Sequence, residues 1–262
     1  MVGDKLRFRF EKAGDLRLLS HHDLMRCAER TMRRAAIPFK MTAGFHPAPR
    51  LVFALSLSLG IVGRNEVVEL ELTEPRESED VLSAFRNQAP KGWNFLSVQV
   101  VPMKASAVAR RIVYRLSLPD DRIESVRTIA ESLMASNEVW VDRYHPRPRQ
   151  VNIRQYLRSL RVEDSSLLAD IWVTSTGTAR ADELLKLLGL SDLVDSGYAL
   201  SRDLVELRDE ITGTADPADQ PPDGPADTLP LDPAAVGAAH RDNENTPASS
   251  QWGSTLDGPV VE

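Results

Sequence analysis

Apolar and polar residues alternate at the start of the chain, and the pattern then changes to a helical period. Residues 5–10 (KLRFRF) alternate with a period of two, which predicts a strand. Ser20 has the side chain of an N-cap, Asp23 is its capping-box partner, and Pro38 ends the helix that follows. The apolar face of this helix is Leu24, Cys27, Ala28, Thr31, Met32 and Ala35. Strands over 51–59, 67–72 and 94–101 and a helix over 77–87 are predicted next. This β-α-β-β-α-β order is that of the ferredoxin-like fold.

The same order recurs in the second half of the chain. The predicted elements are a strand over 112–118, a helix over 121–135, strands over 139–144, 152–160 and 168–174, a helix over 181–188 and a strand over 204–207. The halves share this pattern of elements but no evident repeat of residues. The sequence therefore predicts an α+β protein of two tandem ferredoxin-like lobes, residues 1–103 and 104–211.

The composition changes after residue 211. Residues 212–262 are rich in Pro, Ala, Asp, Gly and Thr, and they hold nine acidic side chains against one arginine. No apolar periodicity continues there, so this segment cannot bury enough apolar surface to offset its ordering entropy. We expect it to be a disordered acidic tail.

Other features of the composition predict a cytoplasmic protein without a cofactor. Charged and apolar residues alternate from the N-terminus on, where a signal peptide needs an apolar stretch. The longest apolar runs are far shorter than the roughly 20 residues that span a bilayer, so no membrane partner is expected. The only cysteine, Cys27, excludes an internal disulfide and a cluster held by several cysteines of one chain.

Two motifs in the first half resemble those of the radical SAM-linked protein family. The first is a helix start of the form LSH-x-D-L-x-R, which here is LSHHDLMR over residues 19–26. The second is a glycine-phenylalanine loop with two prolines that leads into a strand, here GFHPAPRLVF over residues 44–53. The match is strongest over residues 5–75 and extends to about residue 210. The resemblance implies a radical SAM protein as partner. The chain itself lacks the three-cysteine motif of such an enzyme.

The loop over residues 44–50 is the strongest candidate for a binding site. Two prolines stiffen it, and it places an aromatic ring, an imidazole and a guanidinium together, which suits a nucleobase and its phosphate. The candidate residues are Gly44, Phe45, His46, Pro47, Pro49 and Arg50. The alternative is that Phe45 belongs to the core and that the prolines only turn a corner.

Histidines near the two motifs allow three interpretations. His21, Asp23 and His46 are of metal-ligand types, but Asp23 is already explained as a cap, so we predict no metal site. A second interpretation is that His21 or His22 forms a hydrogen bond to the 44–50 loop and fixes it. The third is a catalytic histidine.

Arginines are concentrated in two regions. On one face of the first helix lie Arg26, Arg30 and Arg33, and a second basic run holds Arg143, Arg147, Arg149, Arg154 and Arg158. Two positive regions on tandem lobes would form an electrostatic footprint for RNA. The plainer alternative is that the helix face is simply solvated.

No complete catalytic set is evident in the sequence. We therefore expect a non-catalytic accessory or RNA-binding protein that acts with a radical SAM enzyme in RNA modification. One alternative is a metal-independent endoribonuclease that uses His21, His22 or His46 as general acid or base. The other is a protein–protein adaptor that binds no nucleic acid.

Overall fold

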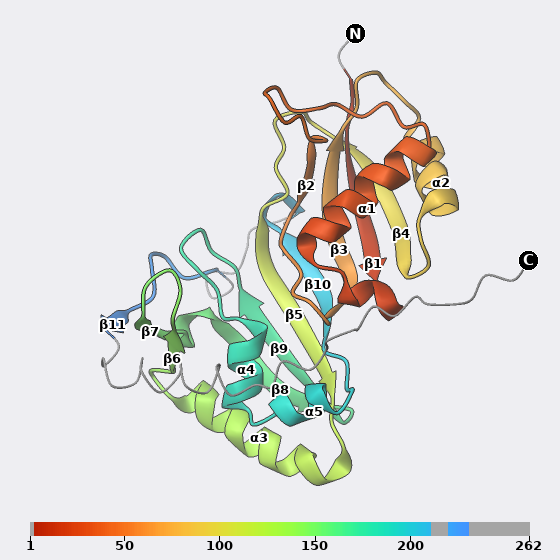
Figure 1. The fold of residues 1–262 in the computed structure, drawn as a ribbon. Helices are drawn as coiled ribbons and strands as arrows, with labels where there is room; N and C mark the ends of the chain where they lie inside the picture. Colours follow the sequence, from red (N-terminus) through yellow and green to blue (C-terminus); the bar gives the residue numbers. More distant parts are fainter. Residues whose placement is uncertain (1–2, 211–219, 231–262) are drawn as a thin grey trace, which may run out of the picture.

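A computed structural model describes residues 3–210 and 220–230 of the chain (Figure 1). Most of the segment predicted to be a disordered tail therefore lies outside the described residues. Within residues 220–230, β11 (Thr228–Pro230) pairs antiparallel with β7 (Arg149–Asn152), so these three residues are an exception to the predicted disorder. The backbone of β11 finds hydrogen-bonding partners in a neighbouring strand, which no periodicity in its own residues signals.

The first half has the predicted element order. It comprises β1 (Lys5–Lys12), a short 3-10 helix (Gly14–Leu18), α1 (His21–Arg34), β2 (Leu51–Phe53), β3 (Val62–Glu71), α2 (Ser78–Gln88) and β4 (Trp93–Val101). The strands lie in the order β4-β1-β3-β2, and each neighbouring pair is antiparallel. Ser20 caps α1 as predicted, because its hydroxyl accepts a hydrogen bond from the Asp23 N–H at 3.2 Å.

Two strand boundaries differ from the prediction. β2 ends at Phe53 because the carbonyl groups of Leu55 and Ser56 turn to the side chain of Arg202 and accept its hydrogen bonds. β3 begins at Val62, earlier than the predicted residue 67, because Val62 pairs with a strand of the second half.

The second half repeats the strand order of the first. It comprises β5 (Ala109–Ser117), α3 (Asp120–Ala135), β8 (Leu157–Glu163), β9 (Ser166–Trp172), α4 (Ala181–Leu187), α5 (Ser191–Asp195) and β10 (Ser201–Leu207). The strands lie in the order β10-β5-β9-β8, again with antiparallel neighbours.

One hairpin of the second half lies outside the large sheet. β6 (Trp140–Arg143) pairs with β7, and β7 also pairs with β11, which gives a separate three-stranded sheet. The segment predicted as one strand over 152–160 is therefore divided into the end of β7, a 3-10 turn (Arg154–Tyr156) and β8.

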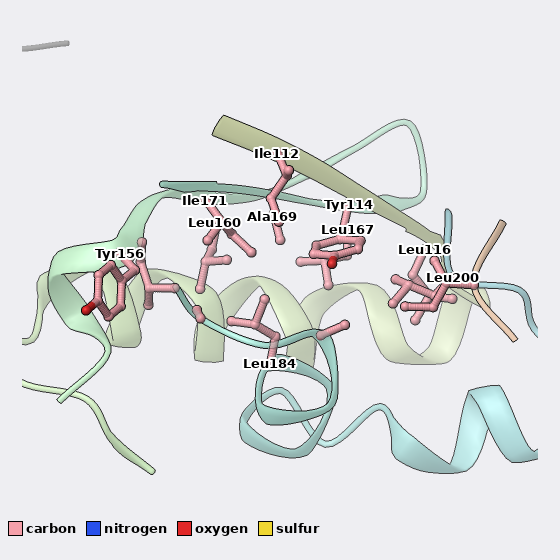
Figure 2. Packing of buried hydrophobic residues seen from close by; sticks show 14 of the residues in the cluster. Ile112, Tyr114, Leu116, Tyr156, Leu160, Leu167, Ala169, Ile171, Leu184 and Leu200 are labelled. Atoms are coloured by element: carbon pink, nitrogen blue, oxygen red, sulfur yellow. The ribbon is translucent and has the colours of Figure 1, made fainter. Parts of the chain in front are cut away.

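The two halves join edge to edge in one mixed eight-stranded sheet, which is an α+β arrangement. β3 and β10 form the parallel junction, where Ser201 faces Val62 and Arg202 faces Gly63. Helices of both halves cover the same face of the sheet (Figure 1). Figure 2 shows the buried layer of the second half, with Leu184 of α4 facing side chains of β5 and β9.

A buried ion pair reinforces the short junction. Arg202 is 1% exposed and Glu66 is 3% exposed. The Nε and Nη2 atoms of Arg202 donate to Oε1 and Oε2 of Glu66 at 2.8 and 2.6 Å. Lys12 is also fully buried and donates to the Leu19 carbonyl at 2.7 Å. Burial lowers the pKa of Lys12, and the charge of Glu66 opposes that shift.

The opposite face of the sheet carries charged side chains that pair with one another. Arg7 donates to Glu69 at 2.8 Å and to Asp209 at 2.6 Å, so it connects β1, β3 and the segment after β10. In the second half, Asp170 accepts from Arg158 at 2.6 Å and contacts Arg111 at 3.3 Å. The predicted basic character is therefore largely neutralised on this face.

The Arg7–Asp209 contact predicts a dependence of stability on pH. The hydrogen bond from Arg7 holds the pKa of Asp209 below its ordinary value. A carboxyl with a depressed folded-state pKa stabilises the fold above its unfolded pKa, about 4, and this contribution is lost as pH falls through the folded-state value. We expect Asp209→Asn to be less stable than the natural protein at neutral pH and the difference to shrink below about pH 4. Urea unfolding at a series of pH values measures the free energy of unfolding of both proteins. A difference between them that stays constant with pH would contradict the prediction.

Candidate nucleic-acid interface

The 44–50 loop forms the tip of a small hairpin between α1 and β2. Met41 and Pro49 face each other across a backbone bridge, and the Arg50 N–H donates to the Lys40 carbonyl at 2.7 Å. Near the tip, the Thr42 N–H donates to the Ala48 carbonyl at 2.7 Å, and the Ala48 N–H donates to the Thr42 hydroxyl at 3.0 Å. These bonds fix the base of the loop.

The loop presents Phe45 to solvent. Gly44 has a φ of +129°, a backbone angle that side chains disfavour. Phe45 follows it and is 101% exposed, so the alternative that Phe45 belongs to the core is wrong. His46 and Pro47 are also exposed, and the prolines at 47 and 49 limit the loop's conformations. The aromatic ring on this stiffened loop is therefore accessible to a partner.

A cluster of cations lies at the base of the same hairpin. Arg50 and Lys40 both contact the Glu71 carboxylate, at 3.3 and 3.2 Å, and their side chains remain nearly half exposed. Arg33 of α1 lies over the ring of Phe39, 5.4 Å from its centroid, just before Lys40 in the chain. The stripe on α1 therefore continues toward the hairpin.

The three arginines of the α1 stripe are exposed. Arg26 contacts Asp23 at 3.4 Å, and Arg33 contacts Glu29 at 2.7 Å, both within the helix surface. Such exposed pairs are weak, about 0–1 kcal/mol, so a phosphate can displace them. Arg30 has no ion-pair partner among the described residues.

His21 forms no hydrogen bond to the 44–50 loop in the described part of the chain. Its ring packs edge-on against Phe53, with 5.4 Å between centroids, and burial lowers its pKa. No hydrogen bond or ion pair joins His21, His22 or His46 to another side chain in the described part of the chain. The predicted hydrogen bond from a motif histidine to the loop is therefore not formed. Within residues 3–210 and 220–230, no three His, Cys, Asp or Glu side chains gather as metal ligands.

The second basic run separates into structural and exposed members. Arg143 is buried and donates to both carboxylate oxygens of Glu183, at 2.6 and 2.9 Å. Arg154 donates to the carbonyl groups of Met134, Ser136 and Leu157. The prediction that these two arginines are available to a ligand is corrected, because their donors are used inside the protein.

Three members of the run remain at the surface. Arg147 is exposed, Arg149 is half-buried, and Arg158 pairs with Asp170 and lies 5.6 Å from the ring centroid of Trp172. The exposed positive charge of this region is thus smaller than the sequence suggests. It is concentrated in the turn between β6 and β7.

A cleft that the sequence did not indicate lies beside β6. Its volume is about 720 Å³, which is within the usual range for small-ligand sites. β6 is the outer strand of its small sheet among the described residues, and consecutive residues 140–145 line the cleft, which therefore follows that strand edge. Its polar and aromatic lining includes Asp142, Tyr144, His145, Gln150, Arg180 and Lys186. α4 (Ala181–Leu187), far along the sequence, closes the other side, and no local pattern of residues indicates that it meets β6.

Comparison with known proteins places the chain in a family but assigns it no reaction. None of the helices in the described residues is long and apolar enough to cross a membrane. No curated protein matches the chain. One solved structure that matches is titled "Crystal structure of putative glycine cleavage system transcriptional repressor", with 7% identity, 79% of this chain and 100% of that chain covered, and a TM-score of 0.21. A similarity of that size bears on neither fold nor function.

The family relationship rests on a longer match. The model of a bacterial family described as "Uncharacterized protein conserved in bacteria (DUF2344)" matches residues 5–183, which is more than half of the chain. The matched segment contains the 41–49 hairpin and most of the residues that line the cleft beside β6, whereas Lys186 and Leu187 of that lining lie beyond it. The chain therefore belongs to the DUF2344 family of bacterial proteins.

Proposed function

We propose that the protein is an accessory protein that binds single-stranded RNA and presents it to a radical SAM enzyme for modification. The observation that supports this best is the fully exposed Phe45 on a proline-stiffened loop beside exposed cations. The radical SAM partner is proposed from the resemblance of the LSHHDLMR and GFHPAPRLVF motifs.

Single strands suit this surface better than a duplex. Bases of an unpaired strand can stack on Phe45, while Arg50 and the α1 stripe contact the phosphates. The face of the sheet opposite the helices is occupied by internal ion pairs such as Arg7–Glu69, so binding across an open sheet is not favoured. We interpret the two half-sheets as ferredoxin-like lobes, in which a connecting hairpin rather than the sheet carries the ligand.

Replacing the exposed ring tests the proposed function. We expect Phe45→Ala to weaken binding of a labelled single-stranded RNA about 5-fold or more, because stacking of one base on an aromatic ring contributes about 1–3 kcal/mol. Fluorescence anisotropy at several salt concentrations measures this. Tyr198→Ala is the matched control, because Tyr198 is 38% exposed and lies outside the hairpin. Equal binding by Phe45→Ala and the natural protein would contradict the proposal.

The charge contribution is measured in the same experiment. Neutralising Arg30 and Arg33 removes phosphate contacts. The salt slope is the steepness with which the logarithm of the affinity falls as the logarithm of the salt concentration rises, and each lost contact lowers it by about 0.7 on single strands. Arg76, which is 53% exposed and pairs with Glu74, provides the control neutralisation.

A protein–protein adaptor is the second candidate, since an exposed phenylalanine also anchors protein interfaces. It is favoured if a partner binds after nuclease treatment and Phe45→Ala abolishes that binding. The endoribonuclease alternative has less support, because the described histidines at 21, 22 and 46 have no side chain positioned to act with them in acid–base chemistry.

A further inference from the structure

A six-residue pattern occurs once in each half of the chain. Residues 45–50 are Phe-His-Pro-Ala-Pro-Arg, and residues 144–149 are Tyr-His-Pro-Arg-Pro-Arg. Both follow the form aromatic-His-Pro-x-Pro-Arg. The expectation that the halves share only a pattern of elements is therefore corrected, because a residue repeat is present in the loops.

Both copies occupy the turn of a hairpin at the same place in the topology. The first hairpin lies between α1 and β2, and the second, β6–β7, lies between α3 and β8. β2 and β8 are the strands at the same position of the two half-sheets. Backbone pairs close each hairpin, Met41 with Pro49 in the first and Arg143 with Arg149 in the second. The two copies differ at one peptide bond, since His145–Pro146 is cis.

The two hairpins offer an aromatic ring in different surroundings. Phe45 is fully exposed, whereas Tyr144 is 37% exposed and lines the cleft beside β6. A ring in the open stacks on any base, because every base has a π-face. A ring at the wall of a cleft holds a base where polar groups can contact its edge.

Polar groups of the cleft are arranged to contact such an edge. The Gln150 side-chain amide donates to Asp142 Oδ1 at 3.0 Å. The amide oxygen of Gln150 and the Oδ2 atom of Asp142 accept no hydrogen bond from a described residue. Lys186 and Arg180 are exposed at the same cleft and supply positive charge for a phosphate. Glu183 adds little negative charge there, since Arg143 neutralises it, and the exposed carboxylates of the lining are those of Asp142 and Asp182.

We propose that the two hairpins bind two nucleotides of one single-stranded RNA, the first by open stacking and the second in a base-selecting cleft. This inference rests on the proposed function. It adds a second binding site and assigns the selection of the base to that second site. Two sites on one strand act together, because binding of the first nucleotide raises the effective concentration of the second.

The experiment compares labelled oligoribonucleotides of increasing length, from a dinucleotide upward, and of each of the four bases. The proteins are the natural chain, Phe45→Ala, Tyr144→Ala, the double variant, Gln150→Ala and the control Tyr198→Ala. For the natural chain we expect affinity to rise about 10²-fold or more once the RNA reaches both hairpins. Each single hairpin variant should lose this rise, and the double variant should lose binding.

The order in which a variant binds the four homopolymers distinguishes the roles of the two hairpins. Phe45→Ala is expected to weaken all four homopolymers equally, whereas Gln150→Ala should change their order of affinity. Thermal unfolding of every variant shows that the fold is kept. A Tyr144→Ala protein with the natural length dependence and base preference would overturn the inference and leave the proposed function standing. RNA binding that Phe45→Ala also leaves unchanged, or no RNA binding by the natural chain, would overturn both.

Discussion

Replacing Glu66 with Gln is expected to lower the free energy of unfolding by about 3–5 kcal/mol, because it leaves the buried guanidinium of Arg202 without a counter-charge. Both side chains are almost fully buried, and two short hydrogen bonds join them across the β3–β10 junction. Lys12 loses the favourable charge of Glu66 at the same time. Urea unfolding followed by tryptophan fluorescence measures the change.

Two further variants make the Glu66 result interpretable. The exposed pair Arg76–Glu74 is a matched control, and Glu74→Gln should cost less than about 1 kcal/mol. A double variant with Met at both position 66 and position 202 should regain most of the stability, because apolar side chains of similar volume need no counter-charge. A loss of less than about 1 kcal/mol in Glu66→Gln would show that water reaches the pair.

Replacing Arg143 with Met is expected to have a comparable effect on stability, about 3–5 kcal/mol, and none on the salt slope of RNA binding. Arg143 and Glu183 are 8% and 7% exposed, and Arg143 also donates to the Thr178 carbonyl at 2.8 Å. Removing the arginine leaves Glu183 buried and unpaired. Equilibrium unfolding and binding isotherms at several salt concentrations measure the two quantities.

The neighbouring Arg147 is the contrasting variant. It is exposed in the turn of the second hairpin, so Arg147→Ala should leave stability within about 0.5 kcal/mol and reduce the salt slope by about 0.7. If Arg143→Met lowered the salt slope and left stability unchanged, the structural role assigned to Arg143 would be wrong.

Local signals predicted the elements that depend on nearby residues. The cap at Ser20, the apolar face of α1 and the strand–helix order follow from spacing within a few positions. β2 was predicted too long because its end depends on Arg202, which is distant in the sequence. The same reason explains Arg143, whose partner Glu183 lies in another element and gives no local sign of the pairing.

The candidate site was predicted in part. The 44–50 loop was identified from its residue types, and the structure places Phe45 in solvent. The cleft beside β6 was not predicted, because α4 and β6 meet only after folding. The repeat of residues 45–50 at 144–149 was present in the sequence, but it lies in turns, where no hydrophobic period draws attention to it.

The position of β10 has a consequence for the order of events during synthesis. β10 is the last strand of the large sheet along the chain, yet it lies in the middle, between β3 and β5. Until residues 201–207 leave the ribosome, the first half can fold while the Val62–Gly63 end of β3 and the facing edge of β5 remain unpaired. Unpaired edges invite pairing with other chains, so a nascent chain that stalls before residue 201 should be prone to aggregation.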